Sequence, residues 1–241
     1  MTPAVRAIAR AALAARPLSL AELDARAGLL TRHDRAYLVP YEVFQDVATL
    51  LTDPRRAGGA LRALSVNGRR WFAYRTTYYD TADLRAFHDR RRTVRERLYA
   101  DTGERRLEIA LRGTRGETVT HRRRLASGEQ VLDAAGAFGR ACGVAVPEGL
   151  RPVLVVEHGR ATFVADGERV TCDAEVVVRD VGDEGREVRG DGGLVRVGSK
   201  GRLPVGEADR VLGRFGVGAV EGGEYGRGVV AVRPELAGLA P

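Results

Sequence analysis

Charged residues in the central part of this chain recur at every second position, the spacing that places side chains on one face of a β-strand. Arg95 and Arg97 lie two positions apart on one expected strand, and Arg169 and Asp173 lie four positions apart on another. The same spacing joins three more pairs: Glu108 with Arg112, Arg122 with Arg124, and Arg196 with Lys200. A guanidinium donates paired hydrogen bonds to phosphate oxygens and stays charged at neutral pH. Repeated arginines on one face therefore predict a surface that binds phosphate.

Two interpretations of this alternation stay open from the residues alone. In an ordinary sandwich the charged face points to water, because antiparallel sheets usually have one solvated face. Arginines recur at matching parity on five or more of the expected strands, which favours a closed barrel with the charged face inward. Such a barrel would be a basic tunnel, and one or two carboxylates inside it would hold a divalent cation that bridges phosphates.

The net charge of the chain also favours an anionic partner. It is +7 over 241 residues, and Lys200 is the only lysine among the 39 basic residues. Coding bias also produces such an excess of arginine, but the charge itself favours polyphosphate, a nucleotide or a nucleic acid. Aromatic residues make up 6% of the chain and are not interleaved with the basic ones. A platform for single-stranded nucleic acid needs such stacking surfaces, so nucleic acid is the less favoured partner.

The elements expected to position these residues are mainly short strands. Period-two hydrophobicity and turn signals predict strands over 72–79, 93–100, 106–112, 117–124, 152–157, 161–165, 168–178, 194–200 and 229–232. Helical spacing and capping residues predict helices over 3–15, from 19 onward, and over 40–51, 82–88, 129–142 and 206–215. Asp166-Gly167 predicts a hairpin turn. Many short strands with few helices predict an α+β, mainly β chain: an antiparallel tunnel-like β-barrel with peripheral helices.

Other protein classes are disfavoured by what the sequence lacks. No apolar stretch approaches the roughly 20 residues of a membrane span, and residues 1–16 mix alanines with arginines unlike a signal peptide. We therefore expect a cytoplasmic protein. Cys142 and Cys172 are far apart and are expected to be reduced thiols. The four histidines show no zinc-ligand spacing.

A series of short motifs, in order between about residues 31 and 236, resembles the VTC domain. Each motif is weak alone, and the ordered series is specific. The matching segments are RHDRAYLVP (32–40) for the opening strand, YYDT (78–81) for YFDT, TVRERLY (93–99) for KVRxRxY, LEIALRG (107–113) for LEVKxRG, RVTCD (169–173) for RxTxD, GSK (198–200) for ExK, and EY (224–225) with RPEL (233–236) for SKYxxG…RPxL.

The resemblance implies a polyphosphate polymerase domain over residues 31–236, preceded by a helical extension over residues 1–30. The VTC domain belongs to the triphosphate tunnel, or CYTH-like, superfamily, and its members polymerise polyphosphate from the terminal phosphate of ATP with a divalent metal, usually manganese. The implied partners are thus polyphosphate or a nucleoside triphosphate, and the implied cofactor is Mn or Mg. The phosphate-binding residues expected in this chain are Arg95, Arg97, Arg112, Arg122, Arg160, Arg169 and Lys200. The carboxylates expected to hold a metal are Glu108 and Asp173.

The sequence departs from the family pattern in a consistent direction. Charged or tyrosine positions of the pattern are occupied here by Ala36, Thr93, Ala110, Thr120, His158, Gly198 and Glu224. Gly198 replaces the glutamate that is the family's strongest metal-ligand candidate, and Glu224 replaces a lysine. Arg112 and Arg122 share faces with two of the replaced positions and are expected to compensate in part. Losing a metal-holding carboxylate should cost several kcal/mol of transition-state stabilisation, so we expect little turnover.

Three functions remain in view. The first is an active metal-dependent phosphotransferase that makes polyphosphate from ATP. The second is a catalytically impaired relative that binds polyphosphate or nucleotide as a regulator. The third is a CYTH-like triphosphatase or cyclase, which should carry an ExExK motif near the N-terminus; Arg32–Tyr37 contains none. The sequence indicates no protein partner.

Overall fold

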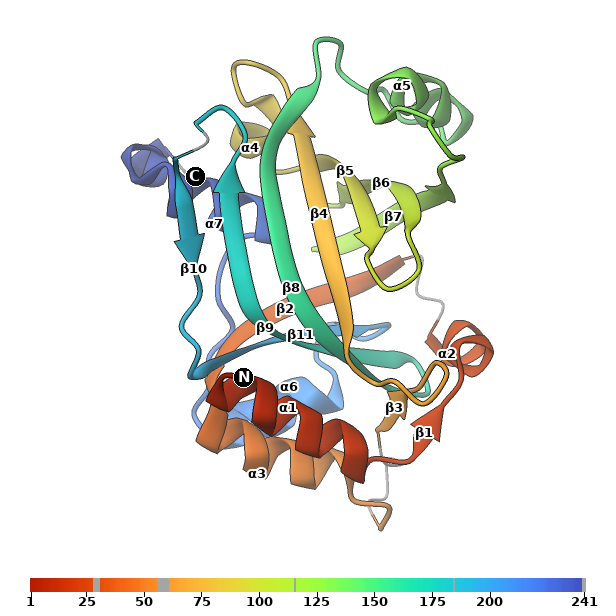
Figure 1. Ribbon diagram of the computed structural model, residues 1–241, viewed down its shortest axis with the longest axis vertical. Helices are drawn as coiled ribbons and strands as arrows, with labels where there is room; N and C mark the ends of the chain where they lie inside the picture. The colour runs from red at the N-terminus through yellow and green to blue at the C-terminus, as the bar shows by residue number, and fades with distance from the viewer. Residues whose placement is uncertain (28–30, 56–60, 115, 184, 240–241) are drawn as a thin grey trace. The chain divides into compact units, whose positions relative to one another are not determined.

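The structure is a computed structural model that describes residues 1–27, 31–55, 61–114, 116–183 and 185–239 (Figure 1). It forms two compact units, each with its own core. Unit 1 comprises Met1–Phe72, His158–Glu175 and Gly190–Glu221. Unit 2 comprises Ala73–Glu157, Val176–Arg189 and Gly222–Pro241.

Strands dominate the described part of the chain. They are β1 (Pro17–Leu18), β2 (Thr31–Pro40), β3 (Arg62–Leu64), β4 (Phe72–Asp80), β5 (Arg92–Tyr99), β6 (Glu104–Arg112), β7 (Glu117–Arg124), β8 (Arg151–Ala165), β9 (Glu168–Asp180), β10 (Glu187–Arg189) and β11 (Leu194–Gly201). The helices are α1 (Pro3–Ala14), α2 (Leu20–Ala27), α3 (Tyr41–Thr52), α4 (Arg85–Asp89), α5 (Val131–Ala141), α6 (Glu207–Arg214) and α7 (Glu224–Val232), with a 3₁₀ turn, η1 (Pro234–Leu239).

The hydrogen-bonded order of the described strands closes on itself. That order is β1-β3-β8-β4-β5-β6-β7-β2-β11-β9-β10, and β8 also pairs with β9. The second pairing joins the ends of an eight-strand run, β8 to β9, into an antiparallel barrel. This confirms the fold class expected from the alternating strands, with helices at the periphery.

In unit 1 the apolar side of the strands packs against helices. Val39 of β2 and Val197 of β11 belong to one buried cluster with Ile8 of α1, Phe44 of α3 and Leu212 of α6. Figure 1 shows α1 and α3 side by side. Because strand side chains alternate, burying the odd-numbered residues of β2 and β11 against these helices leaves their even-numbered residues on the opposite, polar face.

Unit 2 has two buried clusters of its own. Val94, Leu107 and Ile109, from β5 and β6, pack with Val131 and Ala135 of α5. The second cluster joins residues of β4, α4, β8 and α7: Tyr78, Leu84, Phe87, Val153, Leu154, Val156, Tyr225, Val229 and Val232. Burial of Val94, Leu107 and Ile109 against α5 leaves Arg95, Arg97 and Glu108 on the other face of the sheet.

Most expected elements appear, and two expectations were wrong. Residues 229–232 form the end of helix α7 instead of a strand, and the strands expected over 152–157 and 161–165 are one continuous strand, β8. The Asp166-Gly167 turn is confirmed, with Gly167 at a left-handed φ of 75°. The expected domain boundary at residue 30 falls among residues 28–30, outside the described part of the chain, and stays a prediction.

Candidate functional site

The polar face of unit 1 is organised in rows that run across β2, β11 and β9. Antiparallel register sets residues of these strands directly opposite one another. The three rows are Asp34–Lys200–Arg169, Ala36–Gly198–Thr171 and Leu38–Arg196–Asp173. Two rows that carry charge therefore flank a middle row of small, uncharged residues. We call these nine residues, with Arg32, His158 and Arg160, the unit 1 polar face.

Asp173 is the centre of the third row. The Nε and Nη2 atoms of Arg160 donate to its two carboxylate oxygens at 2.5 and 2.9 Å, and those of Arg196 donate to Oδ2 at 3.0 and 2.6 Å. Asp173 is 2% exposed. Burial alone would raise the pKa of this carboxyl, but the positive charges around it, Arg160 first, hold the pKa well below its usual range. The arginines are thus held in place by a permanently charged carboxylate.

The first row contains Lys200, the single lysine of the chain, which has arginines near it. Lys200 lies opposite Arg169 on β9 and Asp34 on β2. Arg32 is buried and donates from Nε to Asp34 Oδ1 at 2.8 Å. Burial lowers the pKa of Lys200 to about 7, and the charges of Arg160, Arg169 and Arg32 act in the same direction, while Asp34 opposes them. Near neutral pH the amine is therefore half protonated.

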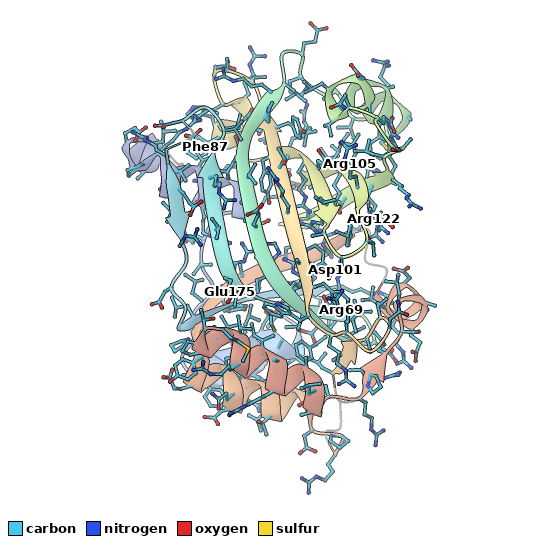
Figure 2. The ribbon with its side chains drawn as sticks, in the orientation of Figure 1. Arg69, Phe87, Asp101, Arg105, Arg122 and Glu175 are labelled. Atoms are coloured by element: carbon cyan, nitrogen blue, oxygen red, sulfur yellow. The ribbon has the colours of Figure 1, made fainter. Side chains whose placement is uncertain are left out.

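Unit 2 carries a comparable polar row across four strands. Cross-strand register aligns Tyr78 (β4), Arg95 (β5), Glu108 (β6) and Arg122 (β7). Glu108 is 3% exposed, and its Oε2 atom lies 2.6 Å from Nη2 of Arg95 and 3.9 Å from Nη1 of Arg97. Burial favours a raised pKa, but Arg97 and Arg95 hold the pKa of Glu108 well below its usual range. Arg122 extends from β7 at the exposed end of this row (Figure 2).

Tyrosine rings support the arginines of unit 2. The guanidinium carbon of Arg95 lies 6.0 Å from the centre of the Tyr78 ring. The corresponding distance is 6.0 Å for Arg97 and Tyr74, and 5.1 Å for Arg106 and Tyr99. An aromatic face attracts a guanidinium through its quadrupole. These arginines are therefore oriented before any ligand arrives.

Glu224, at the first residue of α7, joins the same region of unit 2. It accepts a hydrogen bond from the hydroxyl of Tyr78, whose ring stacks on Tyr225 at 5.2 Å. The N-terminal end of a helix favours a carboxylate. Burial, followed by the charge of Glu224, raises the pKa of Tyr78. Glu224, at a position where the VTC pattern has lysine, thus adds negative charge next to Tyr78 and Arg95.

The positions at which the sequence departs from the VTC pattern gather in uncharged rows. In unit 2, Ala110 lies between Thr93 and Thr120. In unit 1, Gly198 lies between Ala36 and Thr171. Five of the departures therefore fall into two rows instead of being scattered. Each row lies beside a row that keeps its arginines.

The residues present fit a resident divalent cation poorly. A carboxylate has room for about four hydrogen-bond donors, and Asp173 already accepts four from two arginines. His158, a residue that also carries metal-ligating atoms, has Nε2 at 3.9 Å from Asp173 Oδ1. Glu108 is likewise engaged by Arg95 and Arg97. A cation would have to displace guanidinium groups of the same sign of charge, so a metal at Glu108 or Asp173 stays a prediction.

The expected phosphate-binding residues divide between the units. Unit 1 brings Arg160, Arg169 and Lys200 together on one polar face, and unit 2 does the same for Arg95, Arg97 and Arg122. Arg112 lies opposite Thr118 near the end of β6, where it is exposed. Several polar residues of these faces were not among the expected ligands, among them Arg32, Asp34, Tyr78 and Arg196. The spacing of Arg196 and Lys200 had already predicted that these two residues share one face of a strand.

Comparison with known proteins finds distant structural likenesses. No family model matches the sequence, and no curated protein matches it either. A proposed adenylate cyclase from Bacillus halodurans has a TM-score of 0.49 at 14% identity, covering 81% of this chain and 96% of its own. A proposed adenylyl cyclase from Hippeastrum, described as having a dominant triphosphatase activity, has a TM-score of 0.46 at 11% identity, covering 81% and 92%.

An RNA triphosphatase from Schizosaccharomyces pombe has a TM-score of 0.31 at 8% identity, covering 87% of this chain and 84% of its own. At these identities and TM-scores the likenesses are distant, and the chemistry of this chain is inferred from its own residues. Among the described residues, no helix has the length and apolar character needed to cross a membrane.

Proposed function

We propose that this chain binds the phosphate chain of polyphosphate or of a nucleoside triphosphate, as a VTC-type member of the triphosphate tunnel superfamily. The observation that carries the proposal is the charge of the unit 1 polar face. Within that face, five basic side chains outnumber two carboxylates: Arg32, Arg160, Arg169, Arg196 and Lys200 against Asp34 and Asp173. A linear polyanion is the ligand that matches such an excess.

The arrangement assigns different tasks to the basic residues. Arg160 and Arg196 are fixed by Asp173, so their remaining donors point in set directions without further loss of side-chain entropy. Arg169 and Lys200 lie in the other charged row, on the opposite side of the middle row from Arg196 and Asp173. Successive phosphates of one chain could thus contact both charged rows, with the middle row beneath them.

Phosphoryl transfer by this protein is expected to be weak. Catalysis of this reaction depends almost wholly on positioning and on neutralising the charge of the transferred group. The uncharged rows at Gly198 and Ala110 remove such charges, and Glu224 adds a negative one. The arginines also occupy the carboxylates that would hold a metal. We therefore favour a polyphosphate- or nucleotide-binding regulator over an active polymerase.

The triphosphatase alternative predicts a different product. A polymerase joins the terminal phosphate of ATP to a chain, whereas a triphosphatase releases it as inorganic phosphate. The residues of β2 on the polar face are Arg32, Asp34, Ala36 and Leu38, so this strand lacks the two glutamates and the lysine of ExExK. This composition ranks the triphosphatase last.

Thermal unfolding with tripolyphosphate tests the binding proposal. A ligand that binds only the folded state raises the melting temperature by mass action. We expect a rise with the natural protein at low salt, a smaller rise with Arg169→Gln, and no change for Arg214→Gln relative to the natural protein. Arg214 is an exposed arginine of α6 in the same unit, so both variants lose one charge. No shift at millimolar tripolyphosphate would contradict the proposal.

ATP turnover with manganese tests the expectation of weak catalysis. We expect almost no polyphosphate and little ADP from the natural protein, and a partial gain only when Gly198→Glu and Ala110→Lys are combined, since groups that act together are not additive. A Cβ at residue 198 would lie 2.7 Å from Thr171 Oγ1, so Gly198→Glu also requires Thr171 to move. Robust synthesis by the natural protein would show that the remaining arginines suffice.

A further inference from the structure

We propose that Lys200 is a covalent attachment point for aldehydes that carry a phosphate group. Its ε-amine would form an imine with the carbonyl carbon while arginines of the unit 1 polar face hold the phosphate. The inference rests on the proposed phosphate binding by that face. It adds a reaction that the binding proposal does not require.

The register of the strands places an amine beside phosphate-binding groups. Lys200 lies directly opposite Arg169, and Arg160 and Arg32 are close enough for their charges to act on it. An amine alone reacts with many aldehydes. An amine within a cluster of guanidinium groups selects aldehydes that also carry a dianionic phosphate. Each guanidinium can donate two parallel hydrogen bonds to phosphate oxygens.

The middle row leaves room for the amine itself. A Cβ built on Gly198 would lie 3.4 Å from Lys200 Nζ and 2.7 Å from Thr171 Oγ1, so the amine and the Thr171 hydroxyl occupy the space that a side chain at residue 198 would need. The residue opposite Gly198 on β2 is Ala36, which adds only a methyl group. Were Gly198 a glutamate, as in the VTC pattern, its side chain would fill this space and pair with the amine. The departure at Gly198 thus lets the amine lie over the middle row, beside the arginines of the unit 1 polar face.

The charge state of Lys200 suits a nucleophile at neutral pH. Only the neutral amine attacks a carbonyl group, and an ordinary lysine has a pKa near 10.4. Here burial lowers the pKa to about 7, with help from the charges of Arg160, Arg169 and Arg32 and against that of Asp34. About half of the amine is therefore neutral at pH 7. Desolvation beside other cations is a recognised way of activating a lysine.

The proposed step balances without a further reagent. The lone pair of Nζ attacks the carbonyl carbon, and the new C–N bond forms as the C=O π electrons move to oxygen. The amine loses its two protons as the C=N bond forms, and the carbonyl oxygen leaves with them as water. Nothing is oxidised or reduced, and hydrolysis reverses the step.

The composition of the chain makes the proposal easy to test. Lys200 is the only lysine in the sequence, so no other side chain carries a primary amine. Pyridoxal 5′-phosphate serves as a phosphate-bearing aldehyde, and pyridoxal serves as the same aldehyde without phosphate. Borohydride reduces the imine to a stable secondary amine, and peptide mass spectrometry then locates the label.

The matched control moves the lysine to a site outside the cluster. Lys200→Arg keeps the charge and removes the nucleophile, and the double variant Lys200→Arg/Arg214→Lys presents one exposed lysine on α6. At pH 7 we expect Lys200 to label at least about tenfold faster than a lysine at 214, because far more of its amine is neutral. We expect pyridoxal to label Lys200 much more slowly, and tripolyphosphate to protect it.

The outcomes separate this inference from the binding proposal. Equal labelling by pyridoxal and pyridoxal 5′-phosphate, or equal rates at 200 and 214, would overturn the inference. If tripolyphosphate still raised the melting temperature in that case, the binding proposal would stand alone. Rapid, phosphate-dependent labelling of Lys200 that tripolyphosphate suppresses would support both.

Discussion

The polar faces of the two units both arise from strand alternation, but different partners hold their arginines. In unit 2, arginines lie against tyrosine rings and carboxylates, as Arg95 does with Tyr78 and Glu108. In unit 1 no tyrosine belongs to the polar face as defined by its rows. Its arginines are instead fixed by Asp173, and beside them lies Lys200, whose pKa is lowered to about 7.

Under the proposed function, this difference gives two kinds of anion-binding surface. The charge of the unit 2 face is permanent near neutral pH, because guanidinium groups do not titrate there and the pKa of Glu108 is lowered. The charge of the unit 1 face changes by one unit as Lys200 titrates. The comparison therefore predicts that pH sensitivity near pH 7 and most of the ligand selectivity belong to unit 1.

The largest expected effect is that of removing the carboxylate of unit 1. Asp173→Asn leaves the buried guanidinium group of Arg160 and the partly buried one of Arg196 without their counter-charge. Breaking such a buried pair typically costs about 3–5 kcal/mol of unfolding free energy. Glu108→Gln should cost less, because Tyr78 and Tyr74 still face the two arginines. Urea unfolding measures both changes, and a larger loss for Glu108→Gln would contradict the comparison.

A smaller effect should appear in the pH dependence of stability. The folded-state pKa of Lys200 is about 7, against 10.5 when unfolded. Between these values the unfolded state holds more protons, so stability rises with pH. The rise from pH 7 to 8.5 should reach about 1.5 kcal/mol. Burial raises the pKa of Cys172. This shift lowers the free energy of unfolding only at pH values near and above the ordinary pKa of a cysteine thiol.

Lys200→Met isolates this contribution. The variant lacks the titrating amine, so its unfolding free energy should change much less between pH 7 and 8.5. Urea unfolding at several pH values measures the slope. Identical slopes in the natural protein and the variant would mean that the pKa of Lys200 is not lowered.

The smallest expected effect concerns the tyrosine support of unit 2. Tyr99→Leu removes the ring that faces Arg106 at 5.1 Å, and a partly exposed cation–π contact is worth about 0.5–1 kcal/mol. Tyr99→Phe keeps the ring and serves as the control. Thermal unfolding should separate the two variants by a few degrees. Equal stability of the two variants would show that the ring contributes nothing through Arg106.

The alternation of charged and apolar residues was enough to predict most of the barrel strands, because burial against helices enforces it along β5, β6, β9 and β11. It did not predict β2, which was expected only from the VTC resemblance. It failed at 229–232, where valine's preference for strands was misleading. The signal in favour of helix α7 was the spacing of Tyr225, Val229 and Val232, which all enter one buried cluster. The strand β8 was divided wrongly at residues 158–160, which the structure places within one continuous strand.

The candidate site was predictable as a set of arginines but not as an arrangement. Period-two spacing shows that Arg196 and Lys200 share a face, but it does not show that Asp34 and Arg169 lie opposite Lys200. That register depends on how β2 and β9 pair with β11. The lowered pKa of Lys200, and the engagement of Asp173 by two arginines, follow from the register and could not be inferred from the sequence.

Calorimetric titration with tripolyphosphate tests the central proposal most directly. The four proteins to compare at low salt are the natural chain, Arg169→Gln in unit 1, Arg122→Gln in unit 2, and Arg214→Gln outside both polar faces. Each variant removes one positive charge. We predict micromolar or tighter binding by the natural chain, a loss of about tenfold or more for Arg169→Gln, a smaller loss for Arg122→Gln, and none for Arg214→Gln. Equal affinities for all four proteins would contradict phosphate binding by the unit 1 polar face.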